Sequence, residues 1–308
     1  MEEDRDGRYV NNSAMTRERV AWILDRHRGA EEVCFTSGEP TTREDLPDLV
    51  TMARGLGYER ISVMTNGRRL GHLAYAAALV KRGMKRFYVS VHGHTTKLHE
   101  GLTRTPGSFA QTVAGLDTLA QLKRFGVEVH TSTVLTDRNL PHLLDIYRFL
   151  RSHGVDQVVF NVMQANGRAD TFFEQIFPSY TDTAAQFRRF LAEVGEPRPM
   201  AFLVDIPLCV TEGIPDLQRG YVERCEHYDV EESAILDGFD AKGRAETDAT
   251  GKRLVLLTRA DLDIATREKR AECRDCRYDP HCEGVWKNYV RRMGWTEMTP
   301  VAPLPTKT

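Results

Sequence analysis

The sequence predicts an α/β protein built on a parallel sheet. Short β-branched, apolar runs alternate with longer stretches of helical periodicity through the first two-thirds of the chain. The predicted helices between the runs are on the order of ten to eighteen residues long, which is enough for a helical crossover between parallel strands. Most apolar runs end in a turn or a glycine, as strands do before such crossovers.

The elements follow in a regular order. The first helix is predicted over Met15–Arg28, where apolar residues recur on one face. Glu32–Thr36 is predicted to be a buried strand, because this short apolar run ends in a turn at Ser37–Pro40. The cycle then repeats, with glycines ending several helices. Later strands are predicted over Arg60–Thr65, Arg86–His92, Val127–Leu135, Gln157–Met163 and Ala201–Ile206, and later helices over Arg43–Leu56, Leu70–Arg82, Ser108–Phe125, Leu140–His153 and Thr181–Val194.

Six strands separated by helices fit either a doubly wound sheet or a complete or partial (β/α) barrel. No GxGxxG follows the first strand, which argues against a dinucleotide-binding sheet. In a barrel, the site forms at the carboxyl ends of the strands. These ends are mostly polar, small or glycine-rich, which favours a shared site: Ser37–Pro40, Thr65–Gly67, Ser90–His92, Thr133 and Asn161–Gln164.

Composition narrows the function classes. The 308 residues are 41% hydrophobic and 28% charged, so a large buried core is available. A formal net charge of -2 argues against a dedicated nucleic-acid binder. No apolar run approaches the roughly 18 residues of a membrane span, and the charged start MEEDRDGRYV is unlike a signal peptide. We therefore expect a cytoplasmic protein without membrane partners.

The domain organisation changes after about Pro207, where the regular alternation stops. We predict a main domain over residues 1–200, a smaller C-terminal region over 201–298 and a flexible tail over 299–308.

Three of the six cysteines lie close together near the C-terminus: Cys273, Cys276 and Cys282. Clustered thiolates in a cytosolic chain indicate zinc or an iron–sulfur cluster, and composition does not distinguish the two. A four-ligand site needs one more donor, for which the candidates are Cys209, Cys225, Asp275 and His281. Cys34 is mid-strand and is interpreted as a core residue.

His92, His94 and His99 follow the third predicted strand. The HxH pattern could bind a metal ion, but no carboxylate or further histidine has obvious spacing to complete the set. We favour a polar loop at the mouth of a barrel. A metal-dependent hydrolase that uses His92, His94 and Glu39 is disfavoured, because the carboxylate-rich ligand set it requires is not evident.

These motifs together resemble the radical S-adenosylmethionine (radical SAM) superfamily. Phe35–Thr41 is similar to the family's GGEP turn, with Ser37 in place of the first glycine, and Val63–Gly67 is similar to its TNG strand end. Two further segments carry the resemblance, Ser90–Gly93 with Gly107–Phe109, and Thr133–Leu135 with Asn139. The resemblance implies a partial (β/α)6, TIM-like barrel with a small cysteine-rich extension.

The resemblance also implies a cofactor site. Ser37, Gly38 and Glu39 would hold the amino group of the SAM methionine, and Ser90 would lie near its ribose or carboxylate. Asn139 and the strand end at Met163 and Gln164 would lie near the ribose and adenine. The full set of implied cofactor-binding residues is Ser37, Gly38, Glu39, Pro40, Asn66, Ser90, His92, Asn139, Met163 and Gln164. No residue is singled out as catalytic.

The C-terminal region looks like a twitch or shortened SPASM extension, which would hold an auxiliary 4Fe–4S cluster. Its implied ligands are Cys209, Cys273, Cys276 and Cys282, with Cys225 as the alternative to Cys209. Cys209 is preferred because it leaves the last barrel strand beside this region. The implied partners are a peptide or small-metabolite substrate and an external electron donor such as flavodoxin or ferredoxin.

One departure from the family is serious. No cysteine precedes Cys34, so the CxxxCxxC loop that binds the SAM-cleaving cluster is absent from the 308 residues. Three explanations are open: a start that is too late, a truncation, or loss of the chemistry. We expect an upstream segment that carries the loop and a second 4Fe–4S cluster. The 308-residue chain is then expected not to cleave SAM. The alternative is a non-catalytic barrel with a SAM-like pocket and a structural zinc or iron–sulfur knot.

Overall fold

The centre of the fold is a six-stranded parallel sheet. The computed structural model describes residues 2–3, 9–10, 16–36, 38–164, 168–196, 200–214 and 266–303. The strand order is β3-β4-β5-β6-β7-β8, so each strand pairs with its neighbours in the sequence. Their bounds are β3 (Glu32–Phe35), β4 (Arg60–Thr65), β5 (Arg86–Ser90), β6 (Glu128–Leu135), β7 (Gln157–Val162) and β8 (Ala201–Val204).

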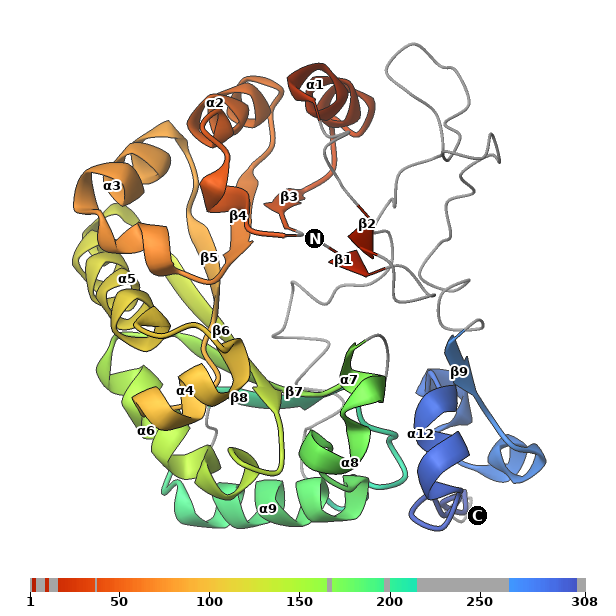
Figure 1. Ribbon diagram of the computed structural model, residues 1–308. Helices are drawn as coiled ribbons and strands as arrows, with labels where there is room; N and C mark the ends of the chain where they lie inside the picture. The colour runs from red at the N-terminus through yellow and green to blue at the C-terminus, as the bar shows by residue number, and fades with distance from the viewer. Residues whose placement is uncertain are drawn as a thin grey trace.

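Helices lie on the outside of the curved sheet (Figure 1). The main ones are α1 (Arg17–Arg26), α2 (Leu46–Gly55), α3 (Leu73–Arg82), α5 (Ser108–Leu122), α6 (Leu143–Ser152) and α9 (Tyr180–Glu193). This arrangement confirms the predicted α/β class and is consistent with a partial barrel. Two helices begin later than predicted, because 3-10 turns take up their first predicted residues: Arg68–Gly71 before α3 and Leu140–His142 before α6. A further 3-10 turn, Pro40–Thr42, lies before the helix predicted over Arg43–Leu56, of which α2 covers Leu46–Gly55.

Three short helices were not predicted: α4 (Thr96–Thr103), α7 (Arg168–Thr171) and α8 (Phe173–Ile176). The Thr95 hydroxyl caps α4 by accepting from the amide of Leu98 at 3.4 Å, and Arg104 ends the helix with φ of 54°. An eight-residue helix is too short for a strong periodic signal, so the capping residue Thr95 was the main sign of this helix in the sequence.

The two faces of the sheet differ in chemistry. Side chains such as Val63, Phe87 and Phe160 are fully buried in the core beneath the helices. The register places Ser62, Arg86 and Glu128 together on the opposite, inner face. This division positions polar groups inside the barrel and apolar groups under the helices.

The predicted burial of the first strand was wrong. Cys34 is exposed, and β3 is only partly buried along its length. Among the described strands, β3 pairs with β4 alone and so lies at an edge of the sheet. The register pairs Cys34 with Ser62, so its side chain lies on the inner face of the sheet and not beneath the helices, which explains why it is not the core residue that its apolar setting suggested.

The helix α5 packs unusually close to the turn after β4. A Cβ atom added at Gly115 would lie 2.2 Å from the carbonyl oxygen of Gly67. The neighbouring Thr112 hydroxyl donates to the carbonyl of Asn66 at 2.9 Å, which holds the turn against the helix. A glycine at position 115 is therefore what lets the Asn66–Gly67 turn sit against α5.

We expect Gly115→Ala to lower the free energy of unfolding by about 1–3 kcal/mol, because the new methyl group has no room. Gly55, also helical, has no atom within 4 Å of its added Cβ, so Gly55→Ala should instead be stabilising, by up to about 1 kcal/mol. Urea unfolding of both variants checks this. Equal stability changes in the two variants would contradict the close approach.

The C-terminal region packs beside α8 and α9. It comprises β9 (Arg267–Glu268), β10 (Val285–Trp286) and α12 (Lys287–Met293), and β9 pairs antiparallel with β10. The Tyr289 ring stacks on Tyr180 with centroids 3.8 Å apart. Since β8 belongs to the main sheet, the predicted main domain extends past residue 200 to Val204. Val301, in the predicted tail, accepts from the Arg277 amide at 2.8 Å.

A carboxylate anchors this packing. Glu297 accepts from the Thr181 amide at 2.9 Å and from the Tyr289 hydroxyl, which itself accepts from the Tyr180 amide at 3.1 Å. Burial by itself raises the pKa of Glu297, but the hydrogen bonds from Tyr289 and Thr181 outweigh it and hold the pKa below its usual value. The ionised form is therefore the one that the fold stabilises.

We expect this carboxylate to make the stability pH-dependent. Because its pKa is lower in the folded state, its contribution is complete above its ordinary pKa and is lost as the pH falls through the folded value. Tm measured between about pH 7 and pH 3 should fall less steeply for Glu297→Gln than for the wild type. Parallel profiles for the two proteins would contradict this role of Glu297.

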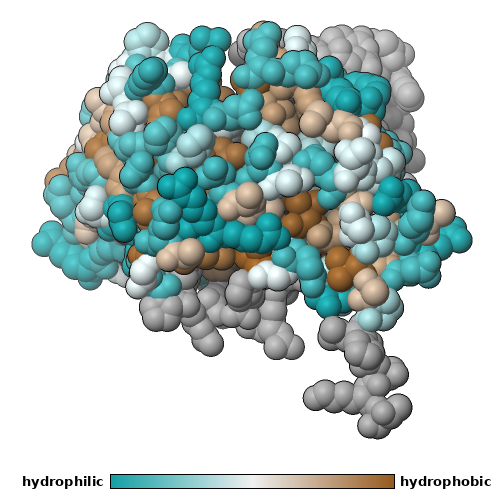
Figure 2. All heavy atoms as spheres, turned by 90° about the horizontal axis from the view of Figure 1, so that it is seen from below, coloured by the Kyte–Doolittle hydropathy of each residue, from teal (hydrophilic) through white to brown (hydrophobic). Residues whose placement is uncertain are grey.

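Among the described residues, no helix is long and apolar enough to cross a membrane. Hydrophilic side chains cover much of the face seen in Figure 2, with smaller apolar areas between them.

Candidate functional site

Most of the cofactor-binding residues that the sequence predicted follow the carboxyl ends of successive strands. Because the strands are parallel and adjacent, these ends lie along one edge of the sheet. The described members are Gly38, Glu39 and Pro40 after β3, Asn66 after β4, Ser90 and His92 at and after β5, Asn139 after β6, and Met163 and Gln164 after β7. Ser37 lies outside the described residues.

Glu39 connects the first two strand ends. Its Oε1 accepts from the Thr41 amide at 3.0 Å and from the Thr65 hydroxyl at 2.6 Å. Its Oε2 accepts from the Asn66 amide at 2.7 Å. The Thr41 hydroxyl also donates to Oε1, at 2.5 Å. The carboxylate of Glu39 thus accepts four hydrogen bonds, and it holds the turn after β3 against the turn after β4.

The turn containing Gly38 leaves backbone accessible. Gly38 has φ of 58°, a left-handed conformation that favours glycine, and it is exposed. The absence of a Cβ atom allows a ligand to approach this backbone closely. An ammonium group can bind backbone carbonyl oxygens, so the turn can accept one without drawing on the carboxylate of Glu39.

Asn139 has a similar connecting role between β5 and β6. The residue is 2% exposed, and its Nδ2 donates to the carbonyl oxygens of His92 at 3.0 Å and Val134 at 2.8 Å. Its Oδ1 accepts from the Thr136 amide at 2.7 Å. Both amide hydrogens are used within the protein, so Asn139 orders the loops of the mouth.

His92 is also engaged inside the protein. Its Nδ1 accepts from the Val134 amide at 3.2 Å, and its own amide donates to Nδ1 of His99 at 3.2 Å. Burial and the neighbouring His99 lower the pKa of His92 to about 3. The imidazole is therefore neutral at ordinary pH and supports the loop.

Ser90, Met163 and Gln164 differ in burial, and Met163 packs in the hydrophobic core. Ser90 is half-buried at the end of β5, Met163 is 8% exposed, and Gln164 is exposed. Beside them, the Nδ2 of Asn161 donates to the Ser132 hydroxyl at 2.5 Å on the inner face. Sequence reasoning grouped Asn161 with the strand end but did not pair it with Ser132, because their contact depends on register.

A polar network that the sequence did not reveal fills the inner face deeper down. Arg86 donates to Glu32 at 3.1 Å and to Glu128 at 2.8 Å, and the Ser62 hydroxyl donates to Glu32 at 2.5 Å. Burial, then the Glu32 carboxylate, raises the pKa of Tyr88. Alternating polar residues in β4, β5 and β6 were the available signal for this network.

Four cysteines line one pocket in the C-terminal region: Cys209, Cys273, Cys276 and Cys282. Their thiols come from the turn after β8 and from two successive 3-10 turns. Two backbone amides donate to sulfur, Gly284 to Cys282 at 3.4 Å and Val301 to Cys276 at 3.3 Å. Asp275 and His281 are exposed and do not line this pocket, and Cys225 lies outside the described residues.

The electrostatics of the pocket suit a bound cation or cluster. Burial and the nearby thiols of Cys282 and Cys276 raise the pKa of Cys209 to about 11, and burial chiefly raises that of Cys273. Thiolates crowded together repel one another, so a positively charged metal centre would stabilise the ionised forms. The amide donors to sulfur would stabilise them further.

The spacing of the thiols bears on the kind of metal. One zinc ion holds its sulfur ligands at about 2.3 Å, so neighbouring sulfur atoms lie about 3.8 Å apart. Among the described side chains, the one group of three or more potential ligands with its ligand atoms within 4.8 Å of one another is His94, His142 and Asp145. No three of the four described thiols therefore have their sulfur atoms all within 4.8 Å of one another.

Comparisons with known proteins agree with the fold. The family model described as the radical SAM superfamily matches residues 4–150. The chain is 31% identical over 144 residues to an AdoMet-dependent heme synthase of Oleidesulfovibrio alaskensis, covering 47% of this chain and 36% of that protein. It is 30% identical over 131 residues to a probable GTP 3′,8-cyclase of Metallosphaera sedula, covering 42% and 39%. The chain thus spans less than half the length of these curated relatives.

Solved structures show the same fold at low identity. The anSMEcpe structure with bound AdoMet aligns with a TM-score of 0.55 and 14% identity, over 89% of this chain and 81% of that one. Streptococcus suis SuiB bound to S-adenosylmethionine aligns with a TM-score of 0.58 and 14% identity, over 96% and 71%.

Proposed function

We propose, from the radical SAM superfamily domain that the chain carries over residues 4–150, that this protein is part of an iron–sulfur enzyme that binds SAM at the mouth of its barrel. The single observation that carries the proposal is the alignment of Gly38, Asn66, Ser90 and Met163 along one edge of a parallel sheet. The family's cofactors supply reductive cleavage of SAM and a radical that abstracts a hydrogen atom from substrate.

The residues of the mouth divide into two groups in this proposal. Glu39 and Asn139 act as positioning residues, because their polar side-chain atoms are occupied within the protein. Gly38 and Ser90 offer backbone and hydroxyl groups to the methionine and ribose ends of SAM. On the inner face Val159, Phe202 and Val204 form a small apolar cluster, which would help to exclude water from the reacting atoms.

The C-terminal pocket is proposed to hold an auxiliary 4Fe–4S cluster. Cys209, Cys273, Cys276 and Cys282 supply the four thiolates. Each would bind a separate iron atom, which suits the wide spacing of the thiols and the amide hydrogen bonds to sulfur. The cluster would contact substrate or accept an electron from it.

The substrate is proposed to be a peptide or a small metabolite, and the electron donor a flavodoxin or ferredoxin. Support comes from the titles of similar structures, which describe SuiB bound to the precursor peptide SuiA and anSMEcpe bound to the Kp18Cys peptide. The names of the curated relatives describe small-molecule chemistry.

The test measures SAM binding and SAM cleavage separately. Equilibrium dialysis of the anaerobically purified chain should show one SAM bound per chain. Under a strong reductant, we expect no 5′-deoxyadenosine from the 308 residues, in which no cysteine precedes Cys34. A version of the protein that includes a CxxxCxxC loop should produce it.

If that version binds no SAM and forms no 5′-deoxyadenosine, the enzyme proposal fails. Stoichiometric zinc with no iron would then support a non-catalytic barrel with a structural metal knot.

A further inference from the structure

Three side chains on the outer rim of the mouth converge, although one of them is far from the other two in the sequence. His94 lies in the loop after β5, His142 ends the 3-10 turn after β6, and Asp145 lies in the first turn of α6. Their ligand atoms all lie within 4.8 Å of one another. His142 and Asp145 have no obvious spacing to His94 in the sequence, and the packing of the β5–α4 loop against α6 brings them to it.

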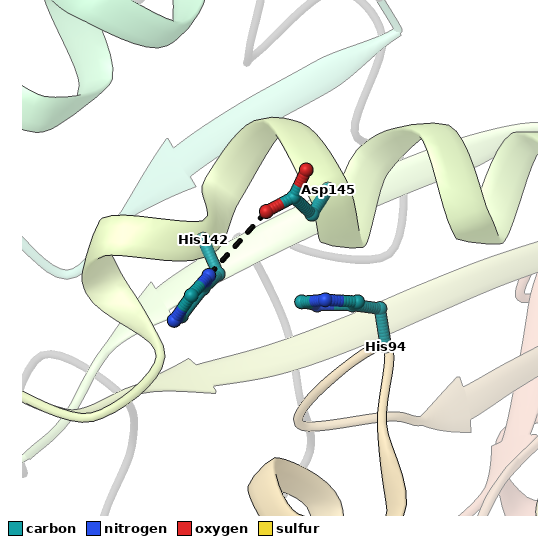
Figure 3. Close-up of side chains that lie close together, drawn as sticks. All are labelled: His94, His142 and Asp145. Atoms are coloured by element: carbon teal, nitrogen blue, oxygen red, sulfur yellow. Dashed lines mark hydrogen bonds and ion pairs between the residues drawn. The ribbon is translucent and has the colours of Figure 1, made fainter.

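The view in Figure 3 shows the His94 ring directed toward the space between His142 and Asp145. The Nδ1 of His142 lies 3.3 Å from Oδ2 of Asp145. Two ligands of a tetrahedral zinc ion, each about 2.0–2.1 Å from the metal, are separated by roughly this distance. His142 and Asp145 therefore already have the spacing of two metal ligands.

The third side chain lacks a partner that would explain its position. The Nδ1 of His94 is buried and has no hydrogen-bond partner among the described residues. The two imidazole rings of His94 and His142 have centroids 5.4 Å apart and are tilted by 53°. A buried ring nitrogen without a donor or acceptor is costly unless something else binds it.

We propose that His94, His142 and Asp145 form a binding site for one divalent cation of the zinc class. Two imidazoles and one carboxylate are the ligand set that such ions take in proteins when a water completes the coordination. His142 and Asp145 are partly exposed, so the ion can enter from solvent. The site is separate from the four cysteines and does not depend on SAM chemistry.

The cation would tie the β5–α4 loop to the start of α6. The same loop carries His92, whose carbonyl is held by Asn139. Binding at the rim would thus reinforce the order of the mouth. A cation that binds only the folded protein raises its Tm in proportion to the logarithm of its concentration.

Cobalt(II) titration distinguishes this site from the cysteines. With the cysteine thiols blocked by alkylation, cobalt should bind at one equivalent and give visible d–d bands without the near-ultraviolet charge-transfer band of a thiolate. His94→Ala and Asp145→Asn should each weaken this binding at least about tenfold. They should also abolish the rise in Tm caused by cobalt.

The matched control is His153, which contacts Asp117 at 2.6 Å and belongs to no group of three ligands among the described residues. His153→Ala should retain full cobalt binding. Unchanged binding in the His94→Ala and Asp145→Asn variants, or a thiolate band in the wild type, would overturn the proposal. Circular dichroism of each variant establishes that lost binding does not reflect lost folding.

Discussion

Cys276→Ala is expected to remove nearly all iron and sulfide from the anaerobically reconstituted chain, from about four of each in the wild type. Cys273→Ala and Cys209→Ala should have the same result. Each thiol lines the same pocket, and a cluster that loses one of four ligands leaves an iron atom open to solvent and loss. The Cys276 sulfur also accepts from the Val301 amide at 3.3 Å, a bond that the variant loses.

Iron and sulfide analysis together with EPR of the reduced protein measures this effect. Cys34→Ala is the matched control, because Cys34 is exposed on β3 and does not line the pocket. It should retain the full iron content. Cys225→Ala tests the alternative fourth ligand.

Loss of iron in Cys225→Ala, with retention in Cys209→Ala, would contradict the ligand set drawn from the pocket. One zinc and no iron in the wild type would contradict the cluster itself.

Glu39→Gln is expected to weaken SAM binding at least about tenfold and to lower the free energy of unfolding by about 1–3 kcal/mol. The carboxylate accepts from two hydroxyls and two amides, and it joins the Gly38 turn to the Asn66 turn. The glutamine side chain has only one oxygen, so its NH2 group would face hydrogen-bond donors that now bond to the second carboxylate oxygen. The Gly38 and Asn66 turns would then no longer be held together, and the Gly38 backbone that is proposed to bind SAM would become disordered.

Equilibrium dialysis with SAM and urea unfolding measure the two effects. Glu44→Gln is the control, because Glu44 is exposed four residues after Pro40 in the segment that precedes α2. It carries the same charge change without joining the strand ends. Wild-type affinity and stability in Glu39→Gln would show that the carboxylate does not hold the mouth together.

Much of the fold was predictable because its helices and strands follow from local patterns of apolar and polar residues. The alternation of apolar runs and helical stretches predicted the six strands of the sheet, and their actual bounds differ by a few residues. Differences arose where 3-10 turns begin a segment, as at Leu140–His142, since such turns carry no distinct periodicity. Strand burial was less predictable, because the apolar pattern of Glu32–Phe35 does not say which strand lies at the edge.

The site was predictable in its motifs and less so in its contacts. The strand-end residues after β3 to β7 were identified because polar residues after an apolar run are a local signal. Their roles were not, since the occupied acceptors of Glu39 and Asn139 depend on residues from neighbouring strands. The Cys273–Cys276 spacing was visible and Cys209 was the preferred fourth ligand, whereas the pocket that the four cysteines share depends on the packing of the C-terminal region.

The sequence by itself therefore determined the element order, the parallel class and the local chemistry of each strand end. Only the tertiary structure decided which distant groups meet. Strand register and helix packing bring together residues that no repeating pattern in the sequence links, such as His94 with Asp145 and Cys209 with Cys282. Local propensities act over a few residues, while these contacts are set by how whole strands and helices pack.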